Sequence, residues 1–310
     1  MTTDIAALSS HVAMAANKTI SPKASAHDVQ KVVVTLSIPM CMLGIFGNGI
    51  IFVFLCCVIK KTKYTIYALN IAIADLLNLI YHFIFFFIFL KPLYTSILFA
   101  LILNMIYALS YNAAFFILAA FCTERCLLVY FPVWSQQHLS KFSPAIVCII
   151  LWGFSCLISV VEFIACHEKH EVSLSCWSAV IVKMFIEFLV FLSALIISSV
   201  ALFMRTQKKA LQIPLATVDI TVIIMSFHFL IFDIAVRLLD AVVFWTERTD
   251  LPLTSISILC DIICSSGNPF IYLFVGCWRP PKAWRPIHVC LERALDGNVA
   301  QTTEENEEKA

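Results

Sequence analysis

The chain has 310 residues, of which 61% are hydrophobic and only 13% are charged, and its formal net charge is +1. Soluble domains carry about twice that share of charged residues, so the composition excludes an ordinary soluble enzyme or binding module. The chain also lacks a basic block, which argues against a nucleic acid as partner.

Glycine is rare, at 7 residues, and no stretch alternates polar and apolar residues as the strands of an outer-membrane barrel do. Long apolar windows predict an all-α fold, a bundle of membrane-crossing helices. Most of the 13 cysteines lie inside these windows, where cysteine behaves as a small hydrophobic residue. They therefore do not indicate a disulfide framework.

A helix needs about 20 apolar residues to cross the lipid core. Seven charge-poor windows reach that length: 32–59, 64–90, 95–123, 142–165, 177–204, 210–244 and 251–277. Seven crossings place the two ends of the chain on opposite sides of the membrane. We predict an N-terminal tail at 1–31, a seven-transmembrane helix bundle at 32–277 and a short tail at 278–310.

The positive residues predict the orientation, because lysine and arginine gather on the cytoplasmic side. Twelve of them lie after the first, third, fifth and seventh windows, whereas the opposite face holds three near the membrane. We therefore expect an extracellular N-terminus and a cytoplasmic C-terminal tail. A glycosylation sequon at Asn17 lies on the same outer side.

The third window, Thr95–Thr123, contains 29 uncharged residues and ends in Glu124-Arg125. Charges at this depth are costly and are usually functional. The alternative is that the Arg125 side chain reaches the lipid headgroups and has no further role.

The spans carry polar motifs in a fixed order. They are Gly47-Asn48, Leu69-Asn70-Ile71-Ala72-Ile73-Ala74-Asp75, Glu124-Arg125-Cys126, Trp152 and Asn268-Pro269-Phe270-Ile271-Tyr272. Together they resemble the motifs of rhodopsin-like G-protein-coupled receptors, over about residues 32–295. Further stretches are similar to the Mas and Mas-related receptors, among them Thr123-Glu124-Arg125-Cys126-Leu127, Phe131-Pro132-Val133-Trp134 and Leu291-Glu292-Arg293-Ala294-Leu295.

The resemblance implies a multi-pass plasma-membrane receptor that is not an enzyme and needs no cofactor or metal. Its expected partners are the lipid bilayer, an extracellular peptide or small cationic ligand, and a heterotrimeric G protein on the cytoplasmic face. A decoy receptor that binds without signalling is an alternative, and a transporter is a more distant one.

The resemblance also implies a disulfide. The family lacks the usual cysteine at the outer end of the third span, where this chain has Ala100, and instead joins the tops of the fourth and fifth spans. Cys166 and Cys176 occupy those places. Two free thiols are the alternative.

Two polar sets are implied to control activation. Asp75 should face Asn268, either at a sodium ion or in a structural network, and Ala114 favours the network because relatives often have a hydroxyl there. Glu124 should hold Arg125 in the resting state.

On activation, Arg125 is expected to move toward the G protein and toward Tyr272, which follows Pro269 in the seventh span. The sixth span departs from the receptor class, with Ala235 in place of its proline and Asp233 in place of its tryptophan. Without the proline we expect a straighter helix.

The ligand pocket is expected to open outward. Tyr107 replaces the aspartate of amine receptors, which argues against a monoamine. Glu162 matches a glutamate that contacts positive charge in related receptors, and Val180 replaces a second acid. The remaining candidates for ligand binding are Lys183, Glu187, Asp233, Arg237, Asp240 and Asp261.

Spacing suggests how these candidates are arranged. Lys183 and Glu187 lie one turn apart and could pair, and Asp233, Arg237 and Asp240 form one stripe of the sixth span. The alternatives are ion pairs that only orient the helices and a charged ligand pocket.

The segment after the seventh span contains Pro280, Pro281 and Pro286, which limit an eighth helix to about 287–295. Cys277 and Cys290 are expected to face the cytosol, where either could be palmitoylated.

Overall fold

A computed structural model describes residues 23–90, 96–140, 142–167, 174–207, 216–246, 251–278 and 286–297. Within these ranges every regular element is a helix, and seven helical spans are long and apolar enough to cross a membrane. The long helices are α2 (Lys23–Cys57), α3 (Lys63–Leu90), α4 (Ile97–Tyr130), α6 (Ser143–His167), α9 (Thr217–Thr246) and α10 (Leu251–Cys277), and the fifth span joins α7 (Leu174–Phe185), η1 (Ile186–Leu192) and α8 (Ser193–Gln207).

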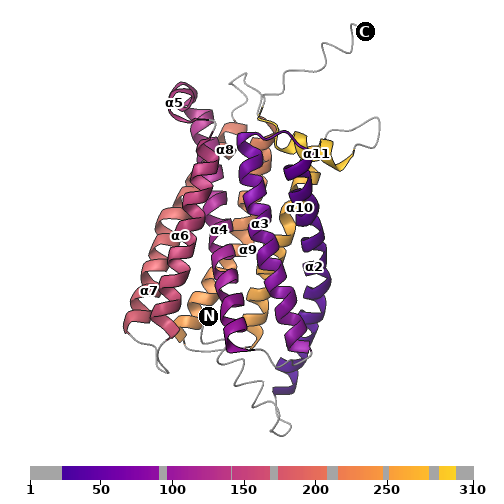
Figure 1. Cartoon of the computed structure of the whole chain (residues 1–310), viewed down its shortest axis with the longest axis vertical. Coiled ribbons are helices and arrows are strands. Elements are labelled where there is room, and N and C mark those ends of the chain that lie inside the picture. The colour runs from indigo at the N-terminus through magenta and orange to yellow at the C-terminus, as the bar shows by residue number, and fades with distance from the viewer. Residues whose placement is uncertain are drawn as a thin grey trace.

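The seven spans lie side by side as one bundle (Figure 1). The helix α2 begins at one end of the bundle, and the short helices α5 (Pro132–His138) and α11 (Ile287–Ala294) lie at the other (Figure 1). The predicted all-α, seven-span fold is confirmed, as is the position of the eighth helix, which ends one residue before the expected boundary.

The helix α4 is the centre of the bundle. In its most apolar window 67% of residues are buried, against 22% in α6 and 11% in the fifth span. Phe116 of α4 stacks on Phe191 of η1 at 4.0 Å between ring centroids, and Phe115 stacks on Phe229 of α9 at 5.3 Å. These rings form part of the main apolar core.

The third span continues past the predicted window to Tyr130, because α4 keeps its helical hydrogen bonds after the apolar residues end. Glu124 and Arg125 are therefore inside the helix, 5% and 4% exposed. An arginine that only reached the lipid headgroups would be exposed, so the buried position rules out that alternative.

The fifth and sixth spans differ in regularity. The fifth contains the π-helix η1, a wider turn of a kind that is often found at functional sites. The helix α9 runs unbroken through Ala235 for 30 residues, as expected without a proline.

Candidate functional site

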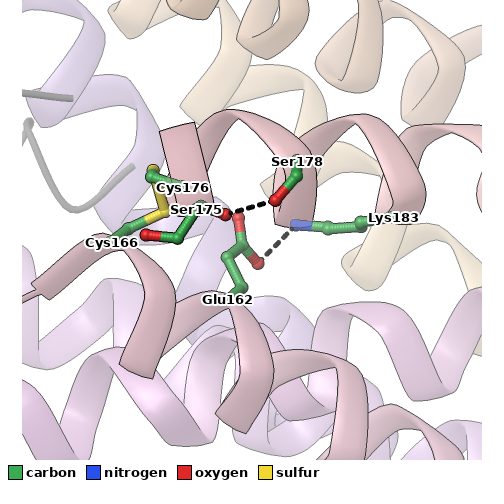
Figure 2. The surroundings of a disulfide bond; sticks show 6 residues. All are labelled: Glu162, Cys166, Ser175, Cys176, Ser178 and Lys183. Carbon is green, nitrogen blue, oxygen red and sulfur yellow. Dashed lines mark hydrogen bonds and ion pairs between the residues drawn. A yellow bond between two sulfur atoms is a disulfide. The ribbon is translucent and has the colours of Figure 1, made fainter. Parts of the chain in front are cut away.

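A first polar layer, called the outer layer because the positive residues predict this end of the bundle to be extracellular, begins at the disulfide. Cys166 near the end of α6 and Cys176 near the start of α7 are joined, with their Cα atoms 4.6 Å apart. The predicted disulfide is thus present. Figure 2 shows Glu162, one turn before Cys166, with its carboxylate directed at the Lys183 ammonium. The Lys183 Nζ atom lies 2.9 Å from Glu162 Oε2, and both side chains are largely buried.

The predicted pairing of Lys183 with Glu187 is wrong. Lys183 crosses to α6, while Glu187 lies in η1 and turns to α9, where its Oε2 atom lies 2.9 Å from Arg237 Nη1. A π-turn holds more residues than an α-turn, so it rotates the side chains within it away from the α-helical register.

The disulfide should stabilise the outer end of the bundle. Replacing both Cys166 and Cys176 by serine is expected to lower the free energy of unfolding by roughly 2–3 kcal/mol, because the bond closes a loop of about ten residues. Thermal unfolding of the purified protein measures the loss. The matched control is Cys156→Ser, which changes a free, exposed cysteine of α6 and should leave the transition unchanged. Equal transitions for all three proteins would contradict the prediction.

Arg237 is the centre of the middle layer. Its Nε atom donates to Asp233 Oδ2 at 2.6 Å, one turn earlier on α9, and its guanidinium lies 4.4 Å from the ring centroids of both Tyr111 and Phe115. Two carboxylates and two ring faces therefore surround one buried cation. This arrangement joins α4, η1 and α9.

Asp261 of α10 is bound by three polar partners. Its Oδ1 atom accepts from Asn78 at 2.8 Å, and its Oδ2 atom lies 2.8 Å from His82 Nε2 and accepts from the Tyr107 hydroxyl at 3.0 Å. Tyr107, a predicted ligand contact, is 3% exposed and is held by this carboxylate.

Sequence reasoning missed Asn78 and His82. Both follow Asp75 at helical spacing, three and seven residues later, so they share its face of α3. That spacing was the available signal. Asp240, the last acid of the α9 stripe, accepts a hydrogen bond from the Ser257 hydroxyl at 3.2 Å.

The inner layer starts at Asp75. The Asn268 amide donates to Asp75 Oδ2 at 2.7 Å, so the two residues face each other as expected. A small internal cavity lies beside them, lined by the carboxylates of Asp75, Asp233 and Asp261 and by Ala114. In the described ranges, no group of three or more histidine, cysteine, aspartate and glutamate side chains is arranged to hold a metal ion.

At the opposite end of the bundle from the disulfide, Arg125 binds Asp219 of α9. Asp219 Oδ1 lies 2.5 Å from Arg125 Nη2 and accepts from Nε at 2.7 Å. Arg125 Nη1 donates to the Tyr64 hydroxyl at 2.5 Å, and the Arg125 guanidinium lies 4.6 Å from the centroid of the same ring. Three helices, α3, α4 and α9, are therefore joined at one guanidinium.

The expected hold of Glu124 on Arg125 is not found. Glu124 Oε2 accepts from the Tyr67 hydroxyl at 2.6 Å, and the carboxylate that binds Arg125 belongs to Asp219. Sequence reasoning missed Asp219 and Tyr64, although both are polar residues whose positions in their spans place them at the same end of the bundle as Arg125. The buried Tyr272 hydroxyl has no hydrogen-bond partner in the part of the chain that the structure describes.

Two other predicted modifications have different outcomes. Asn17 lies outside the described residues. Cys277 at the end of α10 is bonded to Cys290 of α11, so in this structure neither is a free thiol, and palmitoylation of either stays a prediction for the reduced chain.

This chain is therefore a seven-helix integral membrane protein with buried ion pairs between helices, one in the middle of its bundle and one near the end that carries Arg125. No family model matches the chain. Known relatives do. The human proto-oncogene Mas is 31% identical over 82% of this chain and 80% of its own length, and the rat Mas is 30% identical over 85% and 83%. The human Mas-related G-protein coupled receptor member X1 is 30% identical over 82% and 80%.

The chain belongs to the family of Mas and Mas-related G-protein-coupled receptors. It is a multi-pass plasma-membrane protein, and its relatives are receptors rather than enzymes.

Proposed function

We propose that this receptor binds a peptide or small cationic ligand on its extracellular side and activates a heterotrimeric G protein on its cytoplasmic side. The observation that carries the proposal is the buried Arg125–Asp219 pair, which fastens α4 to α9 at the end where the positive residues predict the cytoplasm. The N-terminal tail then lies outside and the C-terminal tail inside.

The cytoplasmic pair supplies a two-state element. While Arg125 is bound to Asp219, α9 is held against α4. When α9 moves away, the guanidinium becomes available to a partner and Tyr272, whose hydroxyl is free of described partners, can approach it. A ligand favours this change if it binds the open arrangement more tightly than the closed one.

The outer charges support a cationic ligand. Glu162 is bound to Lys183, so an incoming cation must compete with that ammonium. Glu187 and Asp233 are bound to Arg237 more deeply in the bundle. Asp240 has a hydroxyl partner and, among the described residues, no base within ion-pair distance. We therefore assign the first contact with a cation to Asp240 and the second to Glu162.

The test is a screen of cationic peptides and amines that measures intracellular calcium and cyclic AMP. With the best ligand, Glu162→Gln should lower potency by roughly tenfold to a hundredfold, the effect of losing one charge-assisted contact. Lys183→Met should raise potency, because it removes the cation that competes for Glu162. Asp240→Asn should lower it.

If Glu162→Gln lowers potency and Lys183→Met raises it, the two residues form a ligand subsite. If the ion pair only orients the helices, both substitutions break the same pair and should change potency in the same direction. Unchanged potency in all three variants would contradict the assignment.

A non-signalling receptor is the second candidate function, favoured by one observation. The helix α9 has Asp233 and Ala235 where most receptors of this class have a tryptophan and a proline, and it is unbroken there. Such a protein would bind the ligand in a radioligand assay and give no calcium or cyclic AMP response.

A further inference from the structure

The short helix α11 folds against the cytoplasmic end of the bundle with one face buried. Leu291, Ala294 and Leu295 are at most 2% exposed and belong to the main apolar core, whereas Glu292 on the other face is exposed. Figure 1 shows α11 beside α10, at the end opposite the start of α2. This segment is thus packed into the bundle rather than lying free beside it.

Its first attachment is to α10, at backbone distance. A Cβ atom added to Gly276 would lie 1.8 Å from the Cys290 carbonyl oxygen, so only glycine permits this approach. The Cys277–Cys290 disulfide lies next to this contact. Disulfides are rare in the cytosol, where thiols are kept reduced. Contacts to α9 and α3 also hold α11 in place.

Its second attachment is to α9. The Thr221 hydroxyl donates to the Ala294 carbonyl at 2.8 Å, and the Val218 amide donates to the Asp296 carbonyl at 3.2 Å. Val218 directly precedes Asp219, the partner of Arg125. The end of α11 is therefore bonded to the same turns of α9 that hold the buried ion pair.

Its third attachment is to α3. A Cβ atom added to Gly297 would lie 2.1 Å from Cε2 of the Tyr64 ring, so the chain passes directly against that ring. The Tyr64 hydroxyl in turn accepts from Arg125. Residues 294–297 thus extend from α9 to α3 alongside the Arg125–Asp219 pair.

We propose that residues 287–297, called the cap, are an autoinhibitory contact that holds the cytoplasmic end of α9 against α3 and covers the approach to Arg125. The inference rests on the proposed coupling to a G protein. The cap is attached to both α9 and α3. When α9 moves away from α4, the cap must lose either its two hydrogen bonds to α9 or its contact with α3. The cap therefore stabilises the closed arrangement and not the open one. Release of the cap precedes entry of the G protein.

The test compares three single substitutions in full-length receptor reconstituted in lipid. Thr221→Val removes one hydrogen bond to the cap at nearly constant volume. Gly297→Ala forces the cap from the Tyr64 ring. Glu292→Ala, on the exposed face of α11, is the matched control. Asp219→Asn serves as a reference that opens the Arg125 pair directly.

Two readouts are measured for each protein. Hydrogen exchange at Val218 reports whether the cap is bound, independently of any G protein. Ligand-free guanine-nucleotide exchange on added G protein reports activity. Thr221→Val and Gly297→Ala should raise both by roughly twofold to tenfold, the effect of one hydrogen bond on an equilibrium, and Glu292→Ala should change neither.

The outcomes separate the two claims. If Asp219→Asn raises nucleotide exchange while the cap variants expose Val218 without raising it, the coupling stands and the autoinhibitory role is wrong. If the cap variants leave Val218 protected as in the natural chain, the attachment is wrong. If no variant, including Asp219→Asn, activates any G protein, the proposed function and the inference both fail.

Discussion

Asp219→Asn should make the receptor active without ligand, with basal nucleotide exchange at least about tenfold above that of the natural chain. The substitution leaves Arg125 buried in the closed bundle without a carboxylate. Removing one partner of a buried ion pair costs about 3–5 kcal/mol, and here the cost falls on the closed state, where the pair exists. The equilibrium therefore moves toward the open state. The measurement is guanine-nucleotide exchange in membranes, normalised to receptor at the surface.

Glu124→Gln is the matched control, because Glu124 directly precedes Arg125 but binds the Tyr67 hydroxyl. The glutamine oxygen still accepts that hydrogen bond, so basal exchange should remain within about twofold of the natural chain. If Glu124→Gln activated the receptor as strongly as Asp219→Asn, the Arg125 partner inferred from the family pattern would be correct and the Asp219 lock would be wrong.

Arg237→Met should destabilise the receptor more than any other single substitution in the outer half. It leaves the buried carboxylates of Glu187 and Asp233 without their cation and removes the stacking on Tyr111 and Phe115. The expected loss is about 3–5 kcal/mol in the free energy of unfolding. Thermal unfolding of the purified receptor in detergent measures it.

The control removes the uncompensated charges as well. In the triple variant Glu187→Met, Asp233→Leu and Arg237→Met, most of the stability should return, since replacing a whole buried ion-pair cluster by hydrophobic residues of similar volume is often nearly neutral. Equal stability of Arg237→Met and the natural chain would show that the pairs contribute little. A triple variant as unstable as Arg237→Met would show that packing, rather than charge, holds α9 to η1.

The sequence alone predicted the features that depend on composition and local spacing. Apolar length locates the seven spans, and the three prolines limit the eighth helix to nearly the residues that form α11. The family pattern placed Cys166 with Cys176 and Asp75 with Asn268 correctly.

Pairings between helices could not be predicted in the same way. Arg125 and Asp219 are 94 positions apart, and nothing in either neighbourhood fixes how α4 and α9 are rotated against each other. The local alternative, Glu124, is adjacent in sequence but points elsewhere, since consecutive residues of a helix lie about 100° apart around its axis.

The same limit explains the error at Lys183. Helical spacing suggested that Lys183 and Glu187 could pair, but each is bound to a residue of another helix. The π-helix that turns Glu187 toward Arg237 has no signature in its sequence, Ile186–Leu192, that sequence reasoning recognised. The cap was missed for a related reason, because amphipathic spacing shows a buried face without showing what covers it.

In the proposed mechanism, Arg125 engages the G protein once it is released from Asp219. The most direct measurement is nucleotide exchange by purified receptor in lipid, comparing Asp219→Asn with the double variant Asp219→Asn and Arg125→Ala. We expect high ligand-free exchange for the single variant and a return to the background of receptor-free vesicles for the double variant. Exchange that persists after Arg125 is removed would contradict this mechanism.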